Sequence, residues 1–291
     1  MKNIKLYCFI ITTIAYIQTN AQQDVTFTLY NYNMNIVNPA YAGTSDRTEF
    51  TSNFRSQFIG IENSPETQSF SLSIPTKGKI GAGLSVVNSS VYVLNETDLH
   101  VDFSYRLQLS ETTDLFLGLK AGGSFVNIDL AKTDIDNDPL FANNVNVFNP
   151  NIGVGAYLKG SRFYLNVSAP AILKTERYEK KAGVVTEASD VLHLYTGVGY
   201  HFPLGEEVTF TPSLLARMVS GIPFSMDISG TLSLYKKIEL GVSHRLEESI
   251  SGLVFFKMAD WVRIGYAYDN AITNLGNYSQ GSHEVILQLR F

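Results

Sequence analysis

The stretch 99–109 constrains the fold of this chain more than any other. Its odd-numbered residues are all apolar or aromatic, and its even-numbered residues are all polar. Because successive side chains of a strand point to opposite faces, this period of two predicts a β-strand. The stretch is longer than the about 5–6 residues of a globular strand and matches the about 9–11 of a tilted strand that crosses a bilayer. It therefore predicts a membrane-spanning strand, with lipid on one face and an aqueous lumen on the other.

Similar stretches recur along the chain and give an all-β fold. They are 47–58, 67–75, 79–87, 114–128, 151–159, 162–169, 190–202, 207–219, 224–235, 238–245, 249–258, 261–269 and 283–291. We predict a transmembrane antiparallel outer-membrane β-barrel of about 14 strands. Because ends of predicted elements shift by about 2–4 residues and elements split or merge, 12 and 16 strands remain alternatives.

The connections between these stretches alternate in length. The short ones are 76–78, 110–113, 160–161, 203–206, 236–237 and 259–260. The others are 59–66, 88–98, 129–150, 170–189, 220–223, 246–248 and 270–282, and most of them are long. Short periplasmic turns and longer external loops are typical of outer-membrane barrels. An even number of strands also brings both ends of the barrel to the periplasm.

The N-terminus has the features of a secretory signal over residues 1–21. Lys2 and Lys5 precede an apolar run at 6–17, and a cleavage site is expected before Gln22. Cys8 is the only cysteine and lies within this run. We therefore expect an exported mature chain with no thiol, which excludes disulfides and thiolate metal sites. Residues 47–291 then form the barrel.

Residues 22–46 are unlike the rest of the chain. They are rich in asparagine and tyrosine, and Pro39 and Gly43 interrupt them, so we expect a turn-rich segment without a long helix or strand. The segment is too short to form a domain. It is a candidate for the interior of the barrel.

Glycines are concentrated on the predicted inner face. The inward positions are Gly81, Gly83, Gly118, Gly122, Gly153, Gly155, Gly197, Gly199, Gly241 and Gly265. Glycines allow a sheet to bend and coil, which is one explanation for them. Bare backbone on the lumen wall also leaves room for an internal segment. We predict a barrel whose lumen is plugged by residues 22–46, and not an open pore.

Charged residues of both signs also fall on the predicted inner face. They are Arg47, Glu49, Arg55, Asp102, Arg106, Lys120, Arg217, Asp227, Glu239, Arg245, Lys257, Arg263, Glu284 and Arg290. Buried charges must be paired, so we expect salt-bridge networks that hold the plug.

The formal net charge of the chain is −5 and its sequence has no basic run, which argues against nucleic-acid binding.

Motifs for catalysis are absent from the sequence. It has no Gly-x-Ser-x-Gly elbow and no His-Glu-x-x-His pair. We considered an outer-membrane hydrolase because Ser282 and His283 lie near the last external loop. The sequence offers no paired nucleophile and base there, so we do not predict an enzyme.

The acidic run Asp134, Asp136 and Asp138 has the spacing of a calcium-loop start. However, Pro139 stands where such a loop needs glycine, and Val145 occupies the twelfth position in place of glutamate. A solvated acidic loop explains the run better. We therefore predict no metal site and no cofactor.

Four segments in order along the mature chain resemble one family. The first is Gln22-Gln23-Asp24 leading to Asn38-Pro39-Ala40-Tyr41-Ala42-Gly43, and the second is Arg55-Ser56-Gln57-Phe58 with Gly60 and Pro65-Glu66-Thr67. The third is Asp138-Pro139 and Phe141 before 149–155, and the fourth is 263–269 followed by 281–284. Together they resemble the PorP/SprF family of Bacteroidetes, outer-membrane proteins associated with the type IX secretion system. Phe58 stands where the family usually has tryptophan.

The resemblance implies a non-enzymatic role in protein secretion and gliding motility. The implied partners are a secreted adhesin-like protein, bound through its C-terminal domain, and components of the type IX secretion system or its motor. The protein would support export or cell-surface anchoring of that adhesin, in contact with outer-membrane lipid. A porin or transporter for a small solute is the alternative function.

We expect the docking surface on external loops 129–150 and 170–189. The candidate residues are Asp134, Asp136, Asp138, Phe141, Lys174, Arg177, Lys180 and Lys181. Merely solvated loops are the alternative, because charged mobile loops are common.

A second group of residues is assigned to anchoring the plug at the periplasmic half or mouth of the barrel: Asn38, Pro39, Tyr41, Gly43, Arg55 and Gln57.

Overall fold

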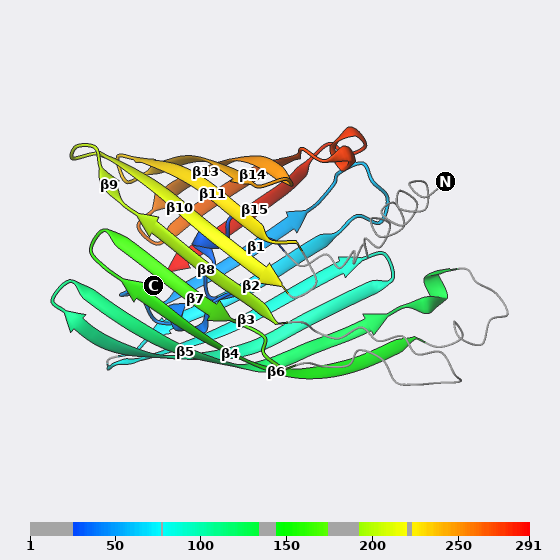
Figure 1. Ribbon diagram of the computed structural model, residues 1–291, viewed down its shortest axis with the longest axis horizontal. Coiled ribbons are helices and arrows are strands. Elements are labelled where there is room, and N and C mark those ends of the chain that lie inside the picture. Colours follow the sequence, from blue (N-terminus) through cyan, green and yellow to red (C-terminus); the bar gives the residue numbers. More distant parts are fainter. Residues whose placement is uncertain (1–25, 77, 134–143, 174–191, 220–222) are drawn as a thin grey trace, which may run out of the picture.

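The computed structural model describes residues 26–76, 78–133, 144–173, 192–219 and 223–291. The expected signal segment 1–21 lies outside these residues. The described strands form one antiparallel sheet in which β1 pairs with β15 and β10 pairs with β11, so the sheet closes into a barrel (Figure 1). β8 and β9 are two parts of one strand, interrupted at His201, and the barrel therefore has 14 strands. This confirms the predicted fold.

The strands occur where the alternation of apolar and polar residues predicts them. They are β1 (Glu49–Ser56), β2 (Glu66–Pro75), β3 (Ile80–Val91), β4 (Leu94–Ser110), β5 (Thr113–Ile128), β6 (Val145–Lys159), β7 (Phe163–Ala169), β8 (His193–Tyr200), β9 (Phe202–Pro203), β10 (Val208–Val219), β11 (Ser225–Leu234), β12 (Ile238–Arg245), β13 (Ser249–Ala259), β14 (Val262–Ala271) and β15 (Ser282–Arg290). The described helices are short 3-10 turns: η1 (Tyr30–Tyr32), η2 (Pro39–Tyr41), η3 (Leu130–Thr133) and η4 (Asn274–Asn277). Among the described residues, no helix has the length and apolar character needed to cross a membrane.

The two ends of the barrel differ in their connections. We call one the turn end; it carries the connections 76–79, 111–112, 160–162, 204–207, 235–237 and 260–261. The other is the loop end, and it carries the remaining connections. Both the start of β1 and the end of β15 lie at the turn end, where Glu49 is paired with Arg290.

Two of the expected loops are partly strand. Residues 88–98 form β3 and β4 except for 92–93, and β6 already begins at Val145. The alternation is lost at 88–98 because polar side chains occupy both faces, although the backbone ladder continues. Asn88 instead donates side-chain hydrogen bonds to Asn95 and Thr97 across the hairpin. As a result β4, β5 and β6, with 17, 16 and 15 residues, are the longest strands.

The burial pattern is the reverse of that in a soluble protein. Large apolar side chains face outward, as in Phe103 (55% exposed) and Leu119 (64%). The inner face carries small hydroxyl and charged side chains, of which Ser69 and Asp102 are completely buried. A β-barrel that spans a lipid bilayer has an apolar exterior, which contacts lipid, around a polar interior. The fold is that of a bacterial outer-membrane protein.

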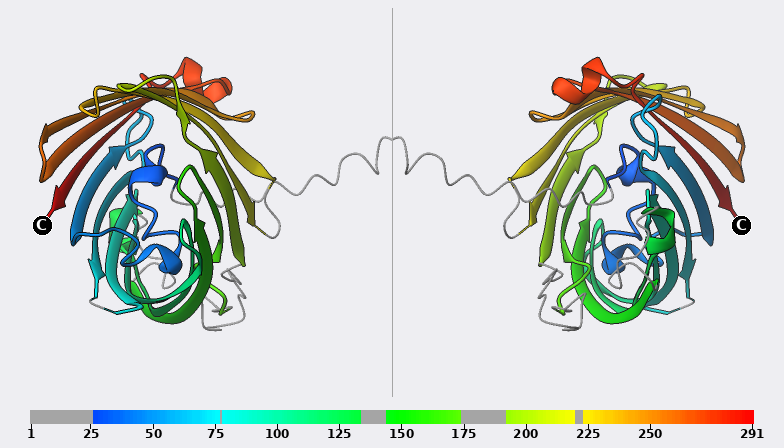
Figure 2. Two further views of the ribbon diagram at one scale, coloured as in Figure 1. Left: turned by 90° about the vertical axis from the view of Figure 1, so that its left-hand side faces the viewer. Right: turned by 90° about the vertical axis from the view of Figure 1, so that its right-hand side faces the viewer.

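Residues 26–46, which we call the plug, run through the barrel from the loop end to the turn end. Figure 2 shows them in dark blue, surrounded by the strands. Thr26 lies beside the loop-end residues Thr273 and Leu275. At the turn end, Lys159 Nζ donates to the carbonyl oxygen of Thr44 (2.9 Å). The chain enters β1 from there, so the barrel begins at the turn end while the plug begins at the loop end.

Candidate functional site

The asparagines of the plug bind the polar wall. Asn33 Nδ2 donates to Ser69 Oγ (3.3 Å), and Ser71 Oγ donates to Asn33 Oδ1 (2.6 Å). Asn35 Nδ2 donates to Asp102 Oδ2 (3.1 Å). An amide side chain both donates and accepts, so each residue satisfies polar groups of the wall that water cannot reach. The asparagine-rich composition therefore serves the contact between the plug and the barrel.

The motif 38–43 forms a tight structure on the inner wall. Asn38 Oδ1 accepts from the backbone nitrogen of Ala40 (2.9 Å) and caps η2, whose first residue is Pro39. Gly43 has a φ of +70°, which favours glycine, and its nitrogen donates to Ser73 Oγ (2.8 Å). Tyr41 packs edge-on against Tyr157 at 5.5 Å.

Three wall glycines allow the plug to approach the wall closely. A Cβ on Gly118 would lie 2.1 Å from the nitrogen of Ala40, and one on Gly155 would lie 2.1 Å from Oδ1 of Asn38. A Cβ on Gly81 would lie 2.2 Å from the carbonyl oxygen of Ala42. No side chain fits at such distances. At these positions the absence of a side chain makes room for the plug.

Other wall glycines meet neighbouring parts of the barrel. A Cβ on Gly265 would lie 2.3 Å from the ring of Phe255, and one on Gly122 would lie 2.0 Å from the carbonyl oxygen of Leu99. Both explanations of the inward glycines therefore apply, each to different positions.

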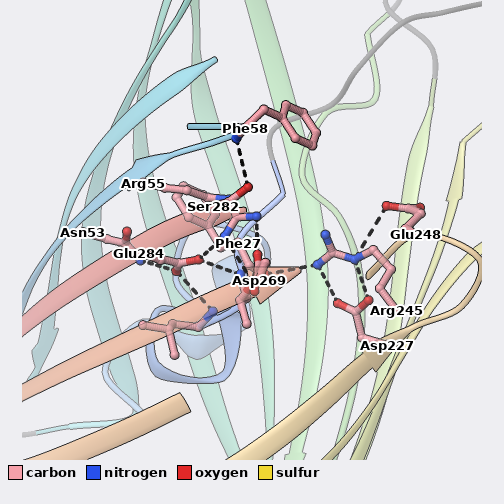
Figure 3. A network of polar contacts seen from close by, with 12 residues as sticks. Phe27, Asn53, Arg55, Phe58, Asp227, Arg245, Glu248, Asp269, Ser282 and Glu284 are labelled. Carbon is pink, nitrogen blue, oxygen red and sulfur yellow. Dashed lines mark hydrogen bonds and ion pairs between the residues drawn. The ribbon is translucent and has the colours of Figure 1, made fainter. Parts of the chain in front are cut away.

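The Arg55 cluster consists of Thr28, Leu29, Arg55, Asp269 and Glu284. Figure 3 shows the side chains of Arg55, Asp269 and Glu284. Arg55 Nη1 pairs with Glu284 Oε2 (2.8 Å), and Arg55 Nη2 pairs with Asp269. Glu284 also accepts from the backbone nitrogens of Thr28 (2.8 Å) and Leu29 (3.1 Å). The side chains of Arg55 and Glu284 are 3% and 0% exposed. One arginine thus links two carboxylates of the wall to the start of the plug.

The position of Arg55 and Gln57 differs from the prediction. Both were expected to anchor the plug at the periplasmic half or mouth of the barrel, but β1 runs from the turn end and Ser56 lies opposite His283, so they are at the loop end. Gln57 borders a cavity of about 290 Å³ there, together with Thr26. The direction of β1 in the predicted topology already implied this position. The motif 38–43, in contrast, lies toward the turn end.

Other predicted inward charges are paired within the lumen. Lys120 Nζ lies 2.9 Å from Asp102 Oδ1, Arg245 Nε lies 2.7 Å from Asp227 Oδ1, and Arg290 Nη2 lies 2.8 Å from Glu49 Oε1. Arg263 pairs with Glu239. Arg106 is about half exposed, 3.9 Å from Asp114. Asp269 is a further inward charge that was not among those predicted, although it follows Arg263, Gly265 and Ala267 on the inner face at a spacing of two.

Tyr32 connects the plug to the wall near the turn end. Its ring stacks on Phe255 at 3.7 Å, and its hydroxyl donates to Glu239 Oε2 (2.8 Å). Gln288 Nε2 donates to the carbonyl oxygen of Tyr32 (2.6 Å). Burial raises the pKa of Tyr32 well above its usual value, so the ring stays neutral in the lumen.

The predicted docking residues lie outside the described part of the chain. These are Asp134, Asp136, Asp138, Phe141, Lys174, Arg177, Lys180 and Lys181.

His283, considered above with Ser282 as part of a hydrolase site, contacts a tyrosine: its Nδ1 is 2.7 Å from the hydroxyl of Tyr266. Within the described ranges, no three histidine, cysteine, aspartate or glutamate side chains lie close enough to hold a metal ion.

Comparison with known structures places the fold among outer-membrane barrels. The chain is similar to Omp33 of Acinetobacter baumannii (TM-score 0.50, 11% identity, covering 84% of this chain and 99% of that one). It is also similar to the toluene transporter TbuX of Ralstonia pickettii (TM-score 0.53, 10% identity, covering 87% and 92%). At this identity the likeness shows the fold alone.

Sequence comparison gives the family. No curated protein matches the chain. The family model described as "Type IX secretion system membrane protein PorP/SprF" matches residues 19–289, nearly the whole chain. The chain therefore belongs to the PorP/SprF family of type IX secretion system membrane proteins.

Proposed function

We propose that this type IX secretion barrel binds a secreted surface protein at its loop end and supports the export or anchoring of that protein. The observation that carries the proposal is the filled lumen. The plug contacts the wall from Thr28 near the loop end to Thr44 at the turn end. A barrel filled in this way acts through the surfaces at its ends, which favours a binding function over conduction.

The loop end is the more suitable of the two ends for a large partner. The longest strands, β4, β5 and β6, extend to it, and β5 and β6 give the connection between them a rigid base. Binding residues are often found on long connections that a rigid scaffold positions. We expect the candidate residues of loops 129–150 and 170–189 at this end, because β5 and β7, which precede these loops, run toward it.

The expected partner is an adhesin-like protein, held through its C-terminal domain, with secretion or motor components as further partners. Loop 170–189 offers charges of both signs, and a partner of complementary charge would associate with it faster and more specifically. The carboxylates at 134, 136 and 138 offer a second, acidic contact.

Affinity purification from the native outer membrane in mild detergent, followed by mass spectrometry, tests the proposal. We expect a large secreted protein to be recovered with the barrel. The variant Lys180→Gln with Lys181→Gln should reduce its recovery. Lys79→Gln with Arg162→Gln removes the same charge from exposed residues of the turn end and should leave recovery unchanged.

Three results would contradict the proposal. Equal loss in both double variants would mean that the loops are not the docking surface. A partnerless barrel that conducts ions would favour the transporter. Recovery of motor or ring proteins without a secreted protein would place the barrel in the secretion machine and remove the anchoring function.

A further inference from the structure

A cavity of about 560 Å³ opens at the turn end of the barrel. Phe255 and Arg263 form part of its wall, and the guanidinium of Arg263 lies over the stacked rings of Tyr32 and Phe255 (5.8 and 5.6 Å). The connections 235–237 and 260–261 lie at its rim. The plug therefore limits the cavity on the lumen side, and the opposite side is open to solvent.

The lining of this cavity is strongly cationic. Its basic residues are Arg47, Lys236, Lys237, Lys257, Arg263 and Arg290, and its acidic residues are Asp46, Glu239 and Asp260. The whole chain, in contrast, carries a net charge of −5. A cleft with an excess of one sign concentrates the field and attracts ligands of the opposite sign.

Half of these basic residues already have carboxylate partners. Lys257 Nζ lies 2.7 Å from Asp260 Oδ1, Arg263 pairs with Glu239, and Arg290 pairs with Glu49. The others are Arg47, Lys236 and Lys237, which are exposed and form no ion pair with any described residue. Asp46 lies in the same lining, so these three basic residues leave an excess of positive charge in the cavity and not three uncompensated charges.

We propose that this cavity binds an acidic peptide segment of a soluble partner that approaches the turn end. Arg47 lies just before β1, and Lys236 and Lys237 lie in the β11–β12 turn, so a ligand with carboxylates spaced along a chain engages them together. The volume lies within the about 300–1,000 Å³ of typical ligand sites. The site is at the opposite end from the proposed docking loops and requires a different partner.

The geometry favours a soluble ligand over a lipid headgroup. Residues that line the cavity, such as Phe255 and Lys257, face the lumen, while their neighbours Phe256 and Met258 face outward and are 44% and 69% exposed. A lipid beside the outer face would have to pass around the strand ends to place its phosphate in the cavity. A peptide from the aqueous side enters directly.

Binding of a fluorescent hexaglutamate peptide to the purified full-length mature barrel tests the inference, with fluorescence anisotropy as the readout. We expect saturable binding at low salt and none of a hexaglutamine peptide. Because the contacts are exposed charges, an increase from about 0.05 M to about 0.5 M salt should weaken binding at least about tenfold. The variant should combine Lys236→Asn, which tolerates the positive φ of 54° there, with Lys237→Gln.

This double variant should bind hexaglutamate about tenfold more weakly than the wild type. Lys79→Gln with Arg162→Gln changes the net charge equally at the same end, outside the cavity, and should bind as the wild type does. Equal weakening in both variants would overturn the site. Unlabelled hexaglutamate, inorganic phosphate and short-chain phosphatidylglycerol then compete with the fluorescent peptide. If phosphate or phosphatidylglycerol displaces it at a lower concentration than hexaglutamate does, the assignment to a peptide is overturned.

Discussion

The backbone of Gly118 in β5 lies against the backbone of Ala40 in the plug. A Cβ on Gly118 would come within 2.1 Å of the Ala40 nitrogen. Gly81 similarly faces the backbone carbonyl oxygen of Ala42, and Gly155 faces the side-chain Oδ1 of Asn38. The plug is therefore held by shape as well as by hydrogen bonds, and small changes in the wall should displace it.

Gly118→Ala should destabilise the barrel and loosen the plug. The extra methyl group has no space, and overpacking of this kind costs about 1–3 kcal/mol. We expect a lower melting temperature and faster protease cleavage within 26–46. Gly252→Ala is the matched control, because a Cβ on Gly252 meets nothing within 4 Å. If both variants melt and are cleaved alike, the plug is not held at Gly118.

Arg55→Met should destabilise the folded barrel much more strongly than a surface change. It would leave the carboxylates of Asp269 and Glu284 buried without a cation, and breaking a buried pair in this way costs about 3–5 kcal/mol. Unfolding in guanidinium chloride measures the loss. Arg106→Met removes a half-exposed arginine and should cost about 1 kcal/mol or less.

A triple variant separates charge from packing in the Arg55 cluster. Adding Asp269→Asn and Glu284→Gln to Arg55→Met removes the uncompensated charges and should recover part of the lost stability. If the triple variant is less stable than Arg55→Met alone, hydrogen bonding to the plug outweighs the charge imbalance.

Much of the fold was predictable because the barrel repeats one rule. Alternation of apolar and polar residues fixes which face of each strand meets lipid, and it located the strands that contain Phe103 and Leu119. The same rule identified inward charges such as Lys120 and Asp102. It failed at 88–98, where polar residues on both faces hide a hairpin whose hydrogen-bond ladder continues.

The arrangement of the plug could be predicted only in outline. The composition of 22–46 and the inward glycines indicated an internal segment. The pairs of residues that hold the plug are far apart in the sequence: Thr28 contacts Asp269 and Glu284, more than 240 positions away. No local pattern encodes these pairings. The docking residues at 134–141 and 174–181 remain a prediction.

The topology predicts which end of the barrel faces the outside of the cell. With short turns in the periplasm, Tyr278 is external and Glu111 is periplasmic. Because the only cysteine lies in the expected signal, single cysteines can be introduced without background. We expect Tyr278→Cys to react with a membrane-impermeant maleimide in intact cells. Glu111→Cys should react only after the outer membrane is permeabilised, and the reverse pattern would invert the topology.

The central claim is that the plug fills the lumen, so that the barrel functions through its ends. Conductance of the intact mature protein in a planar lipid bilayer tests it most directly, with a general porin measured under the same conditions. We predict no current steps of porin size. Stable steps of porin size from the intact protein would show a continuous aqueous path past the plug and contradict this account.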